Sequence, residues 1–533
     1  MNNTPCKKSD IIKCDSFYDV IESLTNSECP TAPLHRICSL LRKEEISYNK
    51  KNGTNKQITL IKEELVENEE ALQEDANLYI ATNTKVKSIS YRLSFFLHDS
   101  EIQEDLSNFT DNDFLGYAIL KISKDENGNN LLNNIYESVI KSPKLLNNYI
   151  HCQKEFSCKV LNKEFIVNGS FYCQQNSLSN VCASASLRMA LNNIFSDKRI
   201  SYEDIYKAIN IKPEKRKLGF LPGQIFEVIK SFGLNYYCED YFLDPQYDYL
   251  NFLHSVVDSG HYGLLIFRCL QDSHIIPVIG HTLNTDIWFN RAQRAYSNSA
   301  DFHWLHNSGW ASHLIINDDN YGMYYCLDGN SLNKQSIPKY DPFMRVFAAI
   351  GISNSKAENS PPRLIKEVAY YYIEQIRKKK ILSDTYSFLL NNNKNQNFKW
   401  LYRFIKALDN QGNRSEIVCR TFLLSKEEYL AHLKNLNDSS INTISEAEIN
   451  NIVHYICDQE YFWIVELSLC DLFSANKRKL GEILLKNTPP KSLNESLIAM
   501  RLPYFWIFPD KLYPSDISSH TNMFRRHSPS DEW

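Results

Sequence analysis

Glycine and proline are scarce in this chain, which has 16 glycines and 18 prolines among 533 residues. Each makes up about 3% of the sequence, below the usual shares of about 7% and 5%. This scarcity disfavours glycine-rich phosphate loops and repeat arrays, and the sequence contains neither. The chain also lacks an excess of charge of one sign, because 59 basic and 63 acidic residues give a formal net charge of −4. A nucleic-acid binder that acts through bulk positive charge is therefore excluded.

No apolar run approaches the length of a membrane span. The longest runs, such as Val346 to Ile352, are far shorter than the roughly 18 residues that a spanning helix needs. The opening residues, MNNTPCKKSDIIKCDS, lack the apolar core of a secretory signal. We therefore expect a soluble protein, located in the cytoplasm or delivered into a host cell as a bacterial effector.

The 14 cysteines are scattered without a framework spacing, which indicates reduced thiols. No CxxC pair and no HExxH motif occurs. The histidines that could join Cys182 around a metal are His303, His306 and His313, but their HxxH spacing lacks a carboxylate partner. The sequence therefore predicts neither a metal site nor a cofactor.

The residues that are present predict several domains, because 43% hydrophobic and 12% aromatic residues suffice for extended cores. The stretch SNSKAENSPP at 353–362 is the clearest boundary. We expect an α+β protein with three parts: an α/β region at 1–150 that starts with a mainly helical extension over residues 1–50, a core at 151–352, and an α/β region at 363–533 whose polar tail from Ser515 is loose.

Hydrophobic periodicity predicts individual elements within these parts. Alternation indicates strands at 88–95 and 115–122, and helical spacing from Leu364 to Ile376 indicates a helix. Further strands are expected at 400–405, 461–467 and 504–508.

Chemistry concentrates between residues 168 and 330. In the run NGSFYCQQNSLSNVCASASLRMALNNIF, apolar residues share one helical face and Ser179 or Asn180 can cap the helix, so Cys182 falls in its first turn. The positive end of a helix favours an anion, which makes Cys182 a candidate nucleophile. Gln174 and Gln175 precede it and could donate a hydrogen bond to an oxyanion.

A base and an orienting group follow in the chain. His274 starts a strand after the polar break that ends the run GLLIFRCLQ. The strand at 313–317 then ends at Asp318 and Asp319, either of which could hold an imidazole in the useful tautomer. His281 lies seven residues after His274, so strand parity places it on the opposite face.

The order of helix-opening Cys, strand-opening His and strand-ending Asp resembles papain-like cysteine peptidases. The most similar type is the bacteriocin-processing peptidases and their bacterial relatives, through Gln174 or Gln175, Cys182-Ala183, GFLPGQIFEVIKSFGL, HIIPVIG and LIIND. The resemblance implies a helical lobe with the nucleophile packed on an antiparallel β lobe with His274 and Asp318. The connection at 282–312, which contains Trp288, Phe289, Trp304 and Trp310, would then be a lid or a substrate contact.

The resulting hypothesis is a cysteine-dependent hydrolase, most simply a protease, with Cys182 as nucleophile, His274 as base, Asp318 as orienting group and Gln175 at the oxyanion. Its partner would be a protein or peptide substrate. The same residues would also serve a deamidase or an acyltransferase. An inactive papain-like interaction module is the alternative outside enzymes, and the sequence leaves the oligomeric state open.

Overall fold

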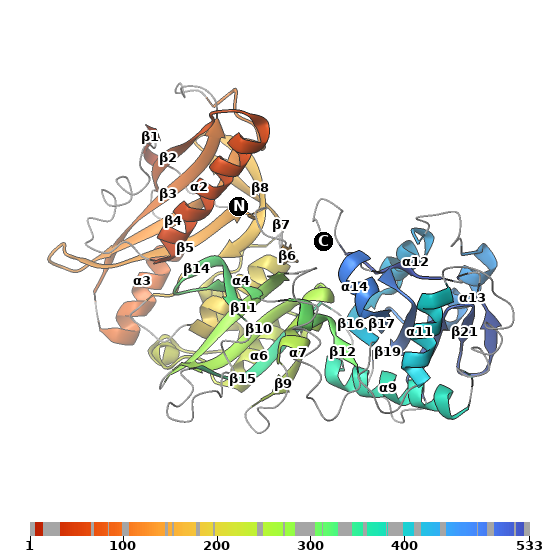
Figure 1. Cartoon of the computed structure of the whole chain (residues 1–533). Helices are drawn as coiled ribbons and strands as arrows, with labels where there is room; N and C mark the ends of the chain where they lie inside the picture. Colours follow the sequence, from red (N-terminus) through yellow and green to blue (C-terminus); the bar gives the residue numbers. More distant parts are fainter. Residues whose placement is uncertain are drawn as a thin grey trace, which may run out of the picture. The chain divides into compact units, whose positions relative to one another are not determined.

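The computed structural model forms two compact units (Figure 1). Each unit is assembled from segments that lie far apart in the sequence. Unit 1 comprises 1–234, 262–280 and 313–347, and unit 2 comprises 235–261, 281–312 and 348–533. The structure describes residues 6–13, 32–65, 69–83, 85–98, 106–143, 148–151, 154–176, 182–195, 198–241, 249–269, 272–282, 304–311, 313–328, 344–354, 360–379, 381, 398–409, 417–436, 444–476, 478–487, 495–515, 517 and 519–526.

A seven-stranded antiparallel sheet in the order β1-β2-β3-β4-β5-β8-β7 opens unit 1. Its strands are β1 (Cys6–Lys13), β2 (Gln57–Leu65), β3 (Lys87–His98), β4 (Phe114–Lys124), β5 (Asn130–Lys141), β7 (Lys154–Val160) and β8 (Lys163–Tyr172). Gly116 lets β4 and β5 approach closely, because it has φ 128° and a Cβ there would lie 2.2 Å from the Val139 carbonyl oxygen. Helix α2 (Ala32–Asn52) contacts β2 and β5, and its apolar side is buried (Figure 1).

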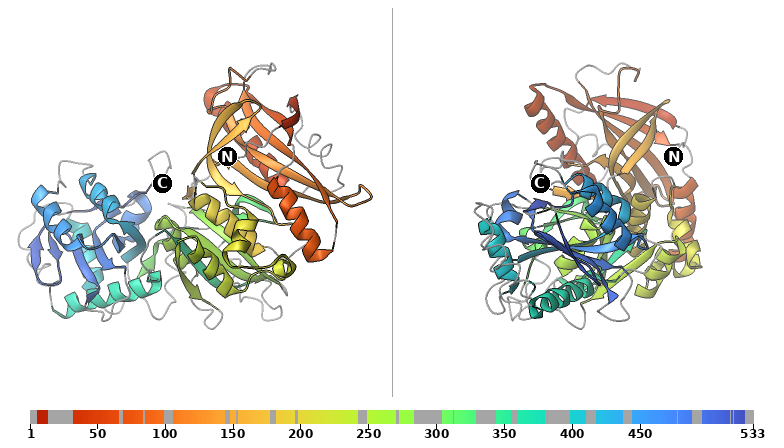
Figure 2. Two further views of the ribbon diagram at one scale, coloured as in Figure 1. Left: turned by 180° about the vertical axis from the view of Figure 1, so that it is seen from behind. Right: turned by 90° about the vertical axis from the view of Figure 1, so that its right-hand side faces the viewer.

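The rest of unit 1 combines short helices with a second sheet (Figure 2). Within the unit, this sheet has the order β14-β13-β11-β10, and β6 also pairs with β11. Its strands are β6 (Asn148–Ile150), β10 (Tyr262–Cys269), β11 (Asp272–Thr282), β13 (His313–Asp318) and β14 (Gly322–Asp328). The helices are α3 (Glu69–Thr82), α4 (Cys182–Ile194), α5 (Tyr202–Ala208), the 3-10 helix η1 (Pro213–Leu218) and α6 (Pro222–Ser231).

Unit 2 is built on a sheet in the order β12-β16-β17-β19-β20-β21-β22, antiparallel except for the β12–β16 pair. The strands of this sheet are β12 (Leu305–His306), β16 (Ile417–Ser425), β17 (Tyr461–Leu469), β19 (Gly481–Lys486), β20 (Leu497–Leu502), β21 (Phe505–Ile507) and β22 (Leu512–Pro514). Unit 2 also contains β9 (Asn235–Asp240), the pair β18 (Arg478–Lys479) and β23 (Thr521–Asn522), and part of β15 (Met344–Ser353), which it shares with unit 1. Its helices are α7 (Tyr249–Asp258), the 3-10 helix η2 (Asn307–Trp310), α9 (Pro362–Lys378), α11 (Phe398–Asp409), α12 (Lys426–Lys434), α13 (Glu446–Ile456) and α14 (Cys470–Asn476).

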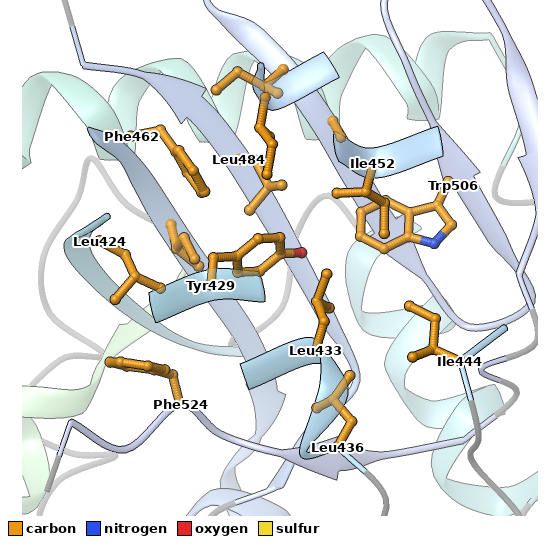
Figure 3. Close-up of a cluster of buried hydrophobic side chains, with 14 of the residues drawn as sticks. Leu424, Tyr429, Leu433, Leu436, Ile444, Ile452, Phe462, Leu484, Trp506 and Phe524 are labelled. Atoms are coloured by element: carbon orange, nitrogen blue, oxygen red, sulfur yellow. The ribbon is translucent and has the colours of Figure 1, made fainter. Parts of the chain in front are cut away.

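One core of unit 2 lies between this sheet and the helices α12 and α13 (Figure 3). Leu433 of α12, Ile452 of α13 and Phe462 of β17 are fully buried there. The ring of Tyr429 packs edge-on against Phe462, while its hydroxyl donates a hydrogen bond of 2.9 Å to Glu482. Strand residues that alternate in direction and helix residues spaced three or four apart therefore share one apolar layer.

The predicted α+β class is confirmed at the level of mixed helices and antiparallel sheets. The prediction that the flanking regions are α/β is wrong, because the strands of the sheet formed by residues 6–172 pair antiparallel throughout, and so do those of the sheet formed by residues 417–514. In the described part of residues 1–50, the eight-residue strand β1 precedes helix α2, which begins at Ala32, so the expected helical extension also contains a strand. The predicted ranges 1–150, 151–352 and 363–533 stay a prediction, since the interleaved units do not test them.

Most predicted elements are present, with two exceptions. The strands at 88–95, 115–122, 461–467 and 504–508 and the helix after Leu364 are confirmed. The strand predicted at 400–405 is wrong, because Leu401, Phe404, Ile405 and Leu408 are buried at helical spacing within α11. The tail is not loose as far as it is described, since Thr521–Asn522 pair with β18 and Phe524 is buried. None of the described helices has the length and apolar character needed to cross a lipid bilayer.

Candidate active site

Cys182 is the first residue of helix α4 and is half-buried, whereas residues 183–193 behind it are buried. The sulfur therefore lies at the helix end where backbone amides have no intrahelical partner, a location that favours a negative charge. The predicted caps Ser179 and Asn180 fall outside the described residues.

Buried hydrogen bonds fix α4 to its neighbours in unit 1. The Asn193 side chain accepts from the Phe171 amide and donates to the Phe171 carbonyl of β8. The Ser186 hydroxyl donates to the Ile275 carbonyl at 2.8 Å, which ties the helix to the residue that follows His274 on β11. Helix α4, which begins with Cys182, and the strand that bears His274 are thus joined directly.

His274 lies on β11 with a side chain that is 16% exposed. Its Nε2 lies 3.3 Å from Asp319 Oδ1 and 3.7 Å from Asp318 Oδ2. Burial opposes the charged ring, but the interactions with Asp318, Cys182 and Asp319 outweigh it and raise the pKa of His274 to about 10. The ring is therefore protonated at neutral pH.

The two carboxyl groups at the end of β13 have different surroundings. Asp318 Oδ1 accepts hydrogen bonds from the backbone amides of Asn320 and Tyr321, so Asp318 closes the β13–β14 turn. Asp319 is fully buried and is the closer of the two to His274. Burial raises the pKa of Asp319 to about 7, with His274 opposing the rise and Asp318 adding to it. Tyr172 of β8 holds this turn through a 3.0 Å hydrogen bond to the Asp318 carbonyl.

The two glutamines upstream of Cys182 are used differently. The side-chain Oε1 of Gln174 accepts a hydrogen bond from the backbone amide of Ile135, and the backbone amide of Gln174 donates one to the Ile135 carbonyl, so the Gln174 side chain is held against β5. Gln175 Nε2 instead donates to Asn320 Oδ1 at 2.7 Å, and Asn320 Nδ2 lies 3.4 Å from His274 Nε2. Gln175 is therefore the glutamine that reaches the histidine's surroundings.

The structure brings together the four residues that the sequence proposed as catalytic, whereas Gln174, the other candidate for the oxyanion, is held against β5. Cys182, His274, Asp318 and Gln175 come from four separate segments and form one connected cluster. The sequence did not single out Asn320, which links Gln175 to His274, although the Asp-Asp-Asn run contains it. The roles of these residues are not tested by their placement.

The expected lid at 282–312 is only partly described. Trp288 and Phe289 lie outside the described residues. Trp304 contacts Tyr370, and Trp310 is buried against Phe473 of α14 within unit 2. Trp310 is thus a core residue, because its ring fills a cluster with Val418 and Met523.

A metal ion is the rival use of this acidic cluster. The ligand atoms of His274, Asp318 and Asp319 all lie within 4.8 Å of one another. A metal ion there would need a neutral His274, whereas the carboxyl groups beside the ring raise the pKa of His274 to about 10 and so favour its charged form.

Comparison with known proteins gives no further guide to this site. No protein-family model matches the chain, and no curated protein is similar to it in sequence.

Proposed function

We propose that this protein is a cysteine-dependent hydrolase that cleaves an amide bond of a protein or peptide substrate, through a papain-like arrangement of helix-borne Cys and strand-borne His and Asp. The observation that supports this proposal most is the position of His274, whose Nε2 lies within 3.7 Å of two carboxyl groups and whose pKa is raised in part by the half-buried Cys182 at the start of α4. An activated nucleophile requires a base within hydrogen-bond reach that is itself held by a third group.

In the first half of the reaction, the proton of the Cys182 thiol resides on His274 and the sulfur attacks the carbonyl carbon of the substrate. The carbonyl oxygen becomes an oxyanion, which the second amide hydrogen of Gln175 and the first amides of α4 would stabilise. His274 then gives its proton to the leaving nitrogen, the C–N bond breaks and an acyl-thioester on Cys182 remains.

In the second half, His274 takes a proton from water, and the resulting hydroxide attacks the thioester. The C–S bond breaks, the acid product leaves and the thiolate–imidazolium pair forms again. The closer carboxyl group, Asp319, keeps the charged ring in place through both halves, while Asp318 holds the turn that presents it. Asp318, the orienting residue expected from the sequence, thus shares this task with its neighbour.

The proposal is tested by incubating the purified protein with a mixture of proteome-derived peptides and identifying the products by mass spectrometry. We expect new peptide termini with the wild type and none with Cys182→Ala. Cys326→Ala is the matched control, because Cys326 is another half-buried thiol of unit 1 and should be dispensable. Conversion of Gln to Glu without new termini would instead identify a deamidase. Unchanged peptides would favour an interaction module and contradict the proposal.

A further inference from the structure

A second cluster of ionisable side chains lies in unit 2 and shares no residue with the candidate active site. His254 and Asp258 are four residues apart on α7 and therefore share one face of that helix. His281, at the end of β11, faces them: its Nε2 lies 3.5 Å from Asp258 Oδ1, and its ring centroid lies 4.1 Å from that of His254. All three side chains are at most 1% exposed.

We propose that His254, Asp258 and His281 bind a divalent transition-metal ion, most suitably Zn²⁺. Their three ligand atoms lie within 4.8 Å of one another. Two ligands about 2.0–2.1 Å from a tetrahedral zinc are separated by about 3.4 Å, close to the distance between His281 Nε2 and Asp258 Oδ1. Two imidazoles with one carboxylate form a ligand set typical of zinc.

The state of the individual groups suits a metal. Among the described residues, Nδ1 of His254 has no hydrogen-bond partner, although it is fully buried. An imidazole nitrogen in a protein interior normally has a partner, and a metal ion at this point would supply one.

The neighbouring residues direct the carboxylate toward the histidines. Arg420 Nε and Asn307 Nδ2 both donate to Asp258 Oδ2, at 2.9 and 3.0 Å. The other oxygen, Oδ1, therefore faces His281. Hydrogen bonds from residues that are not ligands orient a metal-binding carboxylate in this way. The positive charge of Arg420 opposes a cation, so we expect binding in the micromolar range, weaker than that of a site made from thiolates.

His306 lies near this cluster but is excluded as a ligand by its hydrogen bonding. Its Nδ1 accepts from the Ser308 amide at 3.1 Å, so in the neutral ring the proton is on Nε2. A protonated nitrogen has no lone pair for a metal. The proposed site therefore has three protein ligands and a fourth position for water. Because the site is buried, the metal would have a structural role and would link α7 to the end of β11.

The experiment titrates the full-length protein, first freed of metal by a chelator, with Zn²⁺ and with Co²⁺. We expect one equivalent per chain by elemental mass spectrometry, visible absorption bands of tetrahedral cobalt, and a thermal midpoint that rises with zinc concentration. His254→Gln and His281→Gln should each lose at least about tenfold in affinity. His261→Gln is the matched control, because His261 is a buried histidine of the same unit that bonds Tyr237. It should still bind one equivalent.

Two further outcomes would overturn the proposal. Wild-type protein that holds no zinc or cobalt above background contradicts it, and so does full binding by His254→Gln. X-ray absorption of the wild-type zinc form needs no variant and stays decisive if a substituted chain fails to fold. Nitrogen and oxygen ligands at about 2.0–2.1 Å are expected, whereas sulfur at about 2.3 Å would place the metal on a thiol such as Cys182 and contradict the site.

Discussion

At the scale of single residues, two adjacent aspartates contact different groups around His274. Asp318 accepts hydrogen bonds from the turn amides through one oxygen, while Asp319 is fully buried and closer to Nε2 of His274. Both carboxyl groups are buried, and at equal burial the one closer to the ring, with no oxygen held by the turn amides, stabilises the imidazolium more. The functional contribution of Asp319 should therefore exceed that of Asp318.

Substitution by asparagine separates the two aspartates. Asp319→Asn removes the buried charge that holds the imidazolium in place, and we expect kcat/KM to fall at least about tenfold, as happens when a catalytic imidazole loses its orienting carboxylate. Asp318→Asn keeps an oxygen that can still accept from the turn amides and should lose less. Steady-state kinetics on a peptide substrate gives both values, and the reverse order would make Asp318 the orienting residue.

The pH dependence of activity follows from the same groups. Below about pH 7 Asp319 holds a proton and is neutral, so activity should rise as the pH increases through about 7. Above about pH 10 His274 loses its proton and can no longer protonate a leaving group, so activity should fall there. A kcat/KM profile measures both limbs. Asp319→Asn should lack the acid limb, and an unchanged profile in that variant would show that another group titrates.

The sequence identified the reactive residue types but not their partners. Cys182, His274 and the Asp318–Asp319 pair could be predicted because each stands at a recognisable start or end of an element. The choice between Gln174 and Gln175 could not, because it depends on which side chain β5 engages through Ile135. Contacts across separate segments leave no local signal.

At the scale of elements, the position of the nucleophile relative to its base depends on the contact between α4 and β11. Ser186 donates to the Ile275 carbonyl, one residue beyond His274. On the same helix, Ser184 bonds the Tyr206 hydroxyl of α5 at 3.1 Å. Two buried serines of one helix thus face different neighbours, which offers a matched comparison.

Removal of the Ser186 hydroxyl should affect activity as well as stability. Ser186→Ala leaves a buried carbonyl without its donor and should cost about 1–3 kcal/mol. Ser184→Ala should cost a similar amount, but only Ser186→Ala should also lower kcat, because only that bond reaches the histidine strand. Urea unfolding and kinetics on the same preparations check this. Equal kcat values for both variants would show that the contact is merely structural.

Prediction of elements from the sequence worked where one periodicity dominated. Strand β17 alternates against a helix-covered core, and α9 has apolar residues at helical spacing. The failure at α11 has a physical cause: Trp400 to Ile405 is rich in aromatic residues that favour strands, and the helical spacing is evident only when Leu408 is included.

At the scale of the whole molecule, unit 2 contains a continuous row of buried charges. Lys479 contacts Glu466 at 2.9 Å and also contacts Glu482, which in turn bonds Arg501 at 3.0 Å. Each side chain is at most 1% exposed. Because every charge has an opposite neighbour, the loss of one member leaves another buried and unpaired.

Disruption of this row should destabilise unit 2 strongly. Lys479→Met should cost about 3–5 kcal/mol, while Arg363→Met, which breaks the exposed pair with Glu367 on α9, should cost less than about 1 kcal/mol. Hydrogen exchange of the β17 and β19 amides measures this locally. A loss of under about 1 kcal/mol for Lys479→Met would show that these charges are not mutually dependent.

The same row predicts sensitivity to acid. Burial would raise the pKa of Glu482, but Lys479 and Arg501 outweigh it and lower the pKa in the folded state. The stabilisation is therefore present above the unfolded pKa of about 4.3 and is lost as the pH falls toward the lower folded value. Unfolding of unit 2 followed at decreasing pH should show this loss below about pH 4.

The interleaving of the two units could not be predicted from the sequence. Composition marks the stretch at 353–362 because it is polar and rich in turn residues, yet this stretch lies inside unit 2. The exchange between units at 234–235 and 280–281 occurs at the start of β9 and within β11, where no polar linker exists. A strand that passes from one unit to another shows no change in hydrophobic pattern.

The central claim, that Cys182 is a nucleophile activated by His274, is tested most directly by labelling with limiting iodoacetamide between pH 5 and 8. The adduct is located by peptide mapping in the wild type, Cys182→Ala, His274→Ala and the control Cys326→Ala. The account predicts fast labelling confined to Cys182, retained at low pH and lost with His274. Slow labelling spread over many of the 14 thiols, or fast labelling unaffected by His274→Ala, would contradict it.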